Sequence, residues 1–382
     1  MTIGPGRIAL VGLLGLASAM GIGRFAFTPM LPLMQAAGQL SLPQASALAG
    51  ANYLGYLAGA LACTVWTPAP LRAARTGLAA VALLTLGMAL TTLYPLWLAL
   101  RFGAGVASAY VLVGVSAWAV PALAAAGHAR RAGLVFAGVG TGIALAGLGG
   151  LGAGIAGWAP APTWALLGAV AAAVALGVHL ALPQLAGDAA RAAASGRGLG
   201  PDGWRLVVCY GAFGFGYIIP ATFLPALARQ QVADPALFGW VWPAFGAAAA
   251  LSTLLAARWA GRLAPRRLWA LGQGVMALGL ALAAGWPTLA GLLACAVCVG
   301  GTFMVMTMAA MQEARRSAGE RAPRLMAAMT AAFAAGQLAG PFSVGLFGSD
   351  PARALALAQW AAAALLAGGA IILWPDLTRS PA

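Results

Sequence analysis

Long apolar segments separated by short polar gaps make up nearly the whole chain. Hydropathy predicts twelve spans, at 8–34, 44–66, 76–94, 96–120, 132–156, 163–182, 204–228, 238–257, 268–285, 289–311, 325–347 and 354–374. An α-helix needs ~20 apolar residues to cross a bilayer, and the segments have about that length. The polar–apolar alternation of a membrane β-barrel is not visible. The pattern therefore predicts an all-α polytopic membrane protein with twelve transmembrane helices.

The composition excludes the other common protein classes. Of 382 residues, 62% are apolar and only 7% are charged, whereas soluble domains carry about 25% charged residues. A soluble enzyme, a disulfide-stapled secreted domain and a disordered chain are therefore excluded. The four cysteines all fall within apolar segments, so no disulfide framework is expected. The spans offer no nucleophile–base set, carboxylate pair or metal cluster, so we expect no enzyme activity, no cofactor and no metal.

The arginines set the expected orientation. All 21 cationic residues are arginine, against 7 acidic residues. If the N-terminus is cytoplasmic and the spans alternate, nearly all arginines outside the spans lie on the cytoplasmic side, and only Arg229 and Arg353 lie outside. Positive charge in cytoplasmic loops is the rule for membrane proteins. The sequence thus predicts a multi-pass protein of the bacterial inner (cytoplasmic) membrane, with both termini cytoplasmic. The basic loops indicate membrane anchoring rather than nucleic-acid binding.

The chain repeats itself about halfway. The segment at 21–32, GIGRFAFTPMLP, aligns without gaps with GFGYIIPATFLP at 214–225, an offset of 193 residues. A second similarity pairs 129–131 with 314–316, each after the fourth span of its half. These similarities predict an N-terminal six-helix bundle at 1–182, a cytoplasmic linker at 183–203 and a C-terminal bundle at 204–382. Parallel repeats of this kind bind their substrate at the interface between the halves, near the membrane midplane.

Several motifs resemble those of the major facilitator superfamily. LWLALRFGAG at 96–105 is similar to its fourth-helix arginine motif, and GRLAPRR at 261–267 is similar to the basic loop after its eighth helix. GIGRFAFTPMLP at 21–32 and NYLGYLAG at 52–59 resemble the YbfB/YjiJ-type branch. The resemblance implies a transporter of small solutes that works by alternating access. It also implies that Arg262, Arg266 and Arg267 help to latch the cytoplasmic loops, although the equivalent loop after the second span lacks the usual acid.

Arg24 is the most informative single residue, because it lies inside the first apolar span. A charge at the centre of a membrane helix costs ~2.5–3.5 kcal/mol on insertion scales, so it should face a cavity or partners instead of lipid. In one interpretation Arg24 binds an anionic group of the substrate, since guanidinium matches carboxylate and phosphate geometry. In the other it braces backbone carbonyls freed by the helix breakers Pro29 and Pro32.

Arg101 lies in the outer half of the fourth span and has two interpretations as well. It shares a pocket with Arg24, or it braces helices or snorkels to the interface. The other candidate binding residues are polar or aromatic, and either a ligand or interhelical bonding explains them: Asn52, Tyr53, Tyr56, Tyr217, Trp242 and Gln337. Pro220 and Pro225 are expected to break the seventh span as Pro29 and Pro32 break the first.

No Asp or Glu falls inside a predicted span, and Asp234 and Glu313 sit at helix ends. Proton-coupled carriers usually need a titrating group within the membrane, so either coupling uses an unusual group, or the substrate carries the proton, or the protein is a uniporter or exchanger. Two unpaired arginines in the cavity favour an organic anion as substrate. We therefore expect a monomeric secondary active or facilitative transporter of a small solute, with the lipid bilayer as its other partner. The alternative is a transport-like sensor or accessory subunit without net flux.

Overall fold

The computed structural model describes residues 4–65, 69–181, 199–258, 262–348 and 350–375, and every regular element among them is a helix. The first part of the chain forms α1 (Pro5–Leu16), the π-helix η1 (Ala17–Arg24), α2 (Phe27–Ala36), α3 (Leu42–Val65), α4 (Pro70–Ala89), α5 (Tyr94–Ala125), the short 3₁₀ turn η2 (Ala129–Arg131), α6 (Ala132–Ile155) and α7 (Pro160–Ala181). We call these elements the N-terminal helix set.

The second part forms the C-terminal helix set. It consists of α8 (Pro201–Gln231), the single turn α9 (Pro235–Phe238), α10 (Val241–Arg258), α11 (Pro265–Gly285), α12 (Leu289–Ala318), η3 (Gly319–Arg321), α13 (Ala322–Ser343), η4 (Val344–Phe347) and α14 (Pro351–Leu373). Most of the predicted linker, 183–198, lies outside the described residues, and α8 already begins at Pro201.

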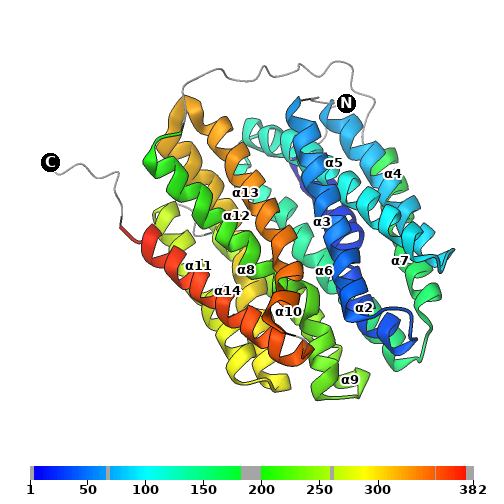
Figure 1. The fold of residues 1–382 in the computed structure, drawn as a ribbon. Helices are drawn as coiled ribbons and strands as arrows, with labels where there is room; N and C mark the ends of the chain where they lie inside the picture. The colour runs from blue at the N-terminus through cyan, green and yellow to red at the C-terminus, as the bar shows by residue number, and fades with distance from the viewer. Residues whose placement is uncertain (1–3, 66–68, 182–198, 259–261, 349, 376–382) are drawn as a thin grey trace.

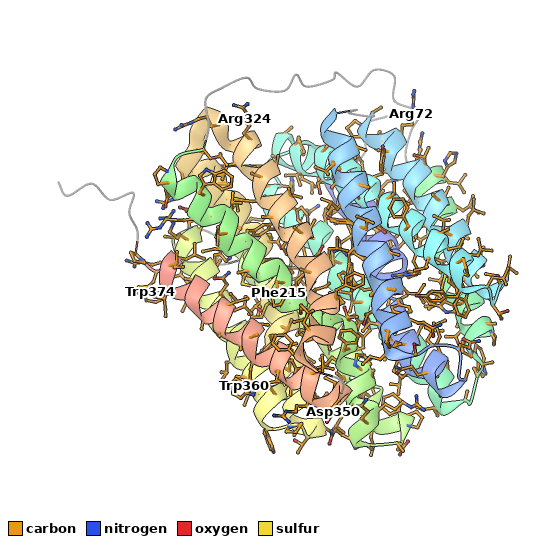
Figure 2. The ribbon with its side chains drawn as sticks, in the orientation of Figure 1. Arg72, Phe215, Arg324, Asp350, Trp360 and Trp374 are labelled. Atoms are coloured by element: carbon orange, nitrogen blue, oxygen red, sulfur yellow. The ribbon has the colours of Figure 1, made fainter. Side chains whose placement is uncertain are left out.

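The described helices can cross a membrane repeatedly. Eleven of them are long and apolar enough by length and composition. The remaining long helix, the 24-residue α3, carries Asn52 and two tyrosines and packs beside α5 and α13 (Figure 1). With α3 included, the helices correspond to the twelve predicted spans. Arg72 and Arg324 lie at one end of the bundle and Asp350 at the other (Figure 2), as alternating crossings require.

Proline and aspartate mark where many helices begin. Pro5, Pro70, Pro201 and Pro265 occupy first-turn positions, where a missing backbone N–H costs nothing. Asp350 caps α14 by accepting hydrogen bonds from two backbone N–H groups of the first turn, which satisfies donors that have no partner within the helix. These local signals explain why the helices begin close to the predicted limits.

The expectation that prolines break both repeat-related spans holds for only one of them. The first span changes to a π-helix over Ala17–Arg24 and is interrupted before α2 begins at Phe27, just ahead of Pro29 and Pro32. In contrast, α8 runs unbroken through Pro220 and Pro225, so the prediction of a break there is wrong. A physical reason is visible at Pro225: the carbonyl of Ala221, which this proline leaves without its helical donor, accepts a hydrogen bond from the Thr28 hydroxyl at 2.6 Å.

Glycines allow the helix backbones to approach closely, as their spacing predicts. A Cβ atom on Gly55 or Gly59 would meet the backbone of α5, and one on Gly138 or Gly142 would meet the backbone of the first span. Small residues play this part generally in membrane helix packing. These contacts confirm that the Gly-xxx-Gly pairs serve packing within the bundle.

One row of glycines joins the two helix sets. Gly133, Gly140, Gly147 and Gly154 follow one another every seven residues along α6, and a Cβ on each would meet α9 or α10 of the C-terminal set. The contact at Gly140 is with the backbone of Gly246, Ala249 and Ala250. We call this row and the helix surface it covers the glycine seam.

Candidate functional site

Arg24 is buried between the two helix sets and not turned toward lipid, with only 3% of its surface exposed. Its Nη2 group donates to Gln337 Oε1 of α13 at 2.5 Å and to the Tyr217 hydroxyl of α8 at 3.5 Å. Its guanidinium lies 3.8 Å from the centre of the Tyr56 ring, on α3. Within the described part of the chain, all these partners are uncharged. The Nε–H of Arg24 is buried and has no hydrogen-bond partner.

The backbone beside Arg24 is fixed by Arg101 and Asn52. Arg101, itself 3% exposed, donates to the carbonyl of Gly23 at 3.1 Å and to that of Arg24 at 2.7 Å. The Asn52 amide donates to the carbonyl of Arg101 at 2.9 Å and to that of Gly23 at 3.4 Å. The interruption between η1 and α2 leaves carbonyls without regular helical donors, and these side chains supply them. Arg101, rather than Arg24, therefore performs the bracing that the broken helix requires.

Tyr217 and Gln337 form a unit on the C-terminal side. The Gln337 amide donates to the Tyr217 hydroxyl, so both groups that face Arg24 are also bonded to each other. The Tyr217 ring lies nearly parallel to Phe303 and Phe333, with centroids 5.7 and 5.4 Å away, which is a favourable offset arrangement. A Cβ on Gly336 would meet the backbone of α8, so α13 and α8 hold this pair in place together.

More hydrogen bonds cross between the helix sets close to Arg24. Thr28 bonds to the carbonyl of Ala221, Tyr53 shares a 2.8 Å hydrogen bond with Thr222, and Arg229 donates to the carbonyl of Pro32 at 2.8 Å. Two of the crossing pairs, Arg24–Tyr217 and Thr28–Ala221, are separated by 193 residues, the offset of the sequence repeat. We call the surface formed by these residues and Gln337 the polar seam.

The structure thus brings most of the predicted binding residues together. Arg24 contacts Tyr56, Tyr217 and Gln337, and Tyr53 lies nearby, its ring centre 5.7 Å from the guanidinium. Asn52 and Arg101 donate hydrogen bonds to backbone carbonyls next to this group and, within the described residues, do not contact its side chains through hydrogen bonds of their own. Trp242 is also buried and stacks on Phe245, and the Phe25 ring lies near both Trp242 and Phe303.

Some residues of the site were missed from the sequence. The rings of Phe25, Phe303 and Phe333 surround it, and a run of apolar residues gives no sign of which rings face inward. Thr28 and Ala221 could have been found, because they are equivalent positions in the two repeats.

Two cavities in the described part of the chain lie away from Arg24. One, of about 190 Å³, is lined by Gln39, Trp97, Trp164 and neighbouring residues at loops of the N-terminal set. The other, of about 460 Å³, is an apolar groove between α8 and α14. In this conformation Arg24 and its neighbours Tyr53, Tyr56, Tyr217 and Gln337 are all buried.

The arginines expected to latch the cytoplasmic loops are arranged differently from one another. Arg266 is buried and forms ion pairs with Asp202 at 2.5 Å and with Glu313 at 3.2 Å, all within the C-terminal set. Arg262 and Arg267 are exposed. Arg266 therefore braces α8, α11 and α12 against one another.

The placement of Glu313 also corrects a prediction. The sequence ends the tenth span at 311, but α12 continues to Ala318 and the Glu313 side chain is completely buried. An acid thus lies inside a long helix after all, at its arginine-rich end. Its charge is compensated by Arg266 and by Arg316, whose Nε lies 2.9 Å away, which explains how it can be buried.

Comparison with known proteins agrees with this architecture. A family model described as "Uncharacterised MFS-type transporter YbfB" matches residues 16–374. No curated protein matches the chain. Among solved structures, the crystal structure of a D-xylose-proton symporter is similar at a TM-score of 0.74, with 13% identity over 97% of each chain. That of the nucleoside transporter NupG gives 0.68, with 12% identity over 98% of this chain and 99% of that one. At such low identity the likeness establishes the fold alone.

Proposed function

We propose that the chain, which belongs to the family of MFS-type transporters typified by YbfB, carries a small organic anion that binds to Arg24. Membership of this family makes it a multi-pass membrane protein and a secondary transporter rather than an enzyme. The identity of the solute is the part that we infer from the site. Alternating access requires the two helix sets to separate and close around a shared binding group, and Arg24 lies where they meet.

The single observation that carries the anion proposal is the set of partners around Arg24. A buried guanidinium normally pairs with an acid, but Gln337, Tyr217 and Tyr56 are all neutral. Its Nε–H remains without a partner. A carboxylate would satisfy this donor and compensate the charge, because the planar fork of guanidinium matches its two oxygens. The surrounding rings of Phe25, Tyr53 and Tyr56 favour a carboxylate attached to an aromatic or other flat apolar body.

Arg101 supports the same assignment by contrast. Its Nε–H, like that of Arg24, has no partner among the described residues, but both of its Nη groups donate to backbone carbonyls, so we propose that its role is to position Arg24. We propose Arg24, Tyr56, Tyr217 and Gln337 as the substrate-binding group, with Tyr53 and Trp242 at its border. Asn52 and Arg101 position the backbone. Pro29 and Pro32 begin the second segment of the broken helix, where the polar seam must open.

The arrangement in the membrane follows from the charge distribution. We propose that 1–182 and 204–382 are two bundles that rock against each other, with 183–203 linking them in the cytoplasm. Arg72 and Arg324 share one end of the bundle (Figure 2), and we assign that end, together with both termini, to the cytoplasmic side of a bacterial inner membrane. One chain contains a complete site, so a monomer suffices for transport.

A ligand screen on the purified protein tests the proposal. A ligand that binds only the folded state raises the melting temperature. We expect sodium benzoate to stabilise the wild type, while choline chloride and glucose do not. Arg24→Ala should lose the benzoate effect, whereas Arg353→Ala, at an exposed arginine of α14, should keep it. Stabilisation by choline or glucose that survives in Arg24→Ala would refute the anion assignment. Binding of benzoate without any flux into proteoliposomes would identify a sensor instead of a carrier.

A further inference from the structure

The bond between Arg24 and Gln337 joins the two helix sets, and this has a consequence for how the carrier moves. Arg24 belongs to the N-terminal set, whereas Gln337 and Tyr217 both belong to the C-terminal set. A group that binds substrate is therefore also the group that holds the empty seam closed. Opening this seam separates Arg24 from both of these partners.

Each end of this bond is fixed to its own helix set. The backbone at Arg24 is held by Arg101 of α5 and Asn52 of α3. Gln337 is held through its bond to Tyr217 and through the backbone contact between Gly336 and α8. Neither end can follow the other when the helix sets rock apart. The bond must break in every opening of the polar seam.

Without a substrate, opening takes Gln337 and Tyr217 away from Arg24 and leaves it with only the rings of its own helix set, Phe25, Tyr53 and Tyr56. A buried charge that loses its hydrogen-bond partners is strongly unfavourable. An anion on Arg24 replaces Gln337 and Tyr217 as partner and compensates the charge as well. The loaded carrier can therefore open its seam, while the empty carrier is held in the closed arrangement.

We propose that this protein is an anion exchanger: the empty carrier reorients slowly because Arg24 is bonded across the polar seam, and a bound anion releases that bond. This inference rests on the proposed anion transport and adds that transport proceeds by exchange of one anion for another. One anion must occupy Arg24 on the outward journey and another on the return. Among the residues that the structure describes, none of the partners of Arg24 is a carboxylate that could take a proton and compensate the arginine in place of a substrate, which agrees with this mode.

Transport in proteoliposomes tests the mode directly. We expect [¹⁴C]benzoate to enter vesicles preloaded with unlabelled benzoate at least about tenfold faster than empty vesicles, because hydrogen bonds to charged groups are the strong ones. Gln337→Leu removes the bond to Arg24. It should lower the ratio of uptake into preloaded vesicles to uptake into empty vesicles, because uptake into empty vesicles becomes faster. Gln359→Leu replaces another buried glutamine, on α14 outside the seam, and should leave the ratio unchanged. Equal rates in loaded and empty vesicles would overturn the exchange mode while leaving the carrier assignment intact.

A second measurement needs no transported anion. In a background with the four native cysteines replaced by alanine, Ala221→Cys places a thiol in the polar seam, where Ala221 is completely buried. We expect slow maleimide labelling of the empty protein and labelling roughly tenfold faster when Gln337→Leu is added. Gln359→Leu should not accelerate it. Unchanged labelling in Gln337→Leu would show that the bond does not hold the seam and would overturn the inference. If benzoate neither binds nor enters vesicles, by net uptake or by exchange, the proposed anion function fails, whatever the labelling shows about the bond.

Discussion

The two surfaces on which the helix sets meet differ in the atoms that make contact. In the glycine seam, the backbones of α6 and α10 touch where Gly140 faces Gly246 and Ala250. In the polar seam, contact is made by side chains, above all by Arg24 with Gln337 and by Tyr53 with Thr222. Backbone contact is lost by a small separation, because dispersion forces fall off steeply with distance. Side chains can turn and exchange partners.

This difference suggests that the two seams have separate roles when the helix sets move. The glycine seam extends along α6 in steps of seven residues and suits a surface on which the helix sets roll while staying in contact. In our proposal, the polar seam carries the groups that a substrate replaces. Each seam can therefore be tested by changing the feature that sets it apart from the other.

The largest effect is expected from filling the glycine seam. Gly140→Leu places a side chain where the backbone of α10 lies, and overpacking of this kind costs about 1–3 kcal/mol or more. We predict loss of the monodisperse peak in size-exclusion chromatography in detergent and loss of transport. Gly152→Leu is the matched control on the same helix, because nothing lies within 4 Å of a Cβ at Gly152. An equally damaging Gly152→Leu would show that helix propensity or insertion, rather than the seam, is responsible.

A smaller effect is expected behind the polar seam. Arg101→Ala removes the donor to the carbonyl of Arg24 and leaves that of Gly23 with only the Asn52 amide at 3.4 Å, at about 1–3 kcal/mol for the unsatisfied group. We predict a clear fall in melting temperature. Arg101→Lys should recover only part of it, because lysine lacks the planar fork that reaches both carbonyls. Full recovery by lysine would mean that charge alone matters at this position.

The smallest effect is expected within the polar seam itself. Thr28→Val removes the hydroxyl that bonds to the carbonyl of Ala221, which Pro225 leaves without its helical donor. The cost should be about 1–2 kcal/mol, seen as a modest loss of thermal stability together with faster maleimide labelling of Ala221→Cys. Thr28→Ser keeps the hydroxyl and should behave as the wild type. A stability loss in Thr28→Ser equal to that in Thr28→Val would show that keeping the hydroxyl does not preserve stability and would contradict the role of this hydrogen bond.

The sequence was sufficient for the fold because membrane insertion makes hydropathy decisive. Spans about 20 residues long can be read along the chain, and the repeat at 21–32 and 214–225 anticipates that equivalent positions meet, as Arg24 and Tyr217 do. The sequence also identified Arg24 as a buried charge. It left open which arginine binds and which one braces, since both lie in apolar spans.

What the sequence did not reveal depends on rotation about helix axes and on contacts distant in the chain. The continuity of α8 at Pro225 depends on Thr28, a partner from the other helix set. The burial of Glu313 depends on Arg266, 47 positions earlier on α11. A hydropathy profile treats each segment alone and cannot register such pairs. Tertiary partners, rather than local preference, decide these details.

The most direct test of the account compares its two buried arginines in one binding experiment. Equilibrium binding of [¹⁴C]benzoate to purified protein should be lost in Arg24→Gln, because this change removes the donors and the charge that meet the carboxylate. Arg101→Gln should lower the melting temperature but still bind benzoate below that temperature. Binding that persists in Arg24→Gln and disappears in folded Arg101→Gln would contradict the assignment of Arg24 as the anion-binding group.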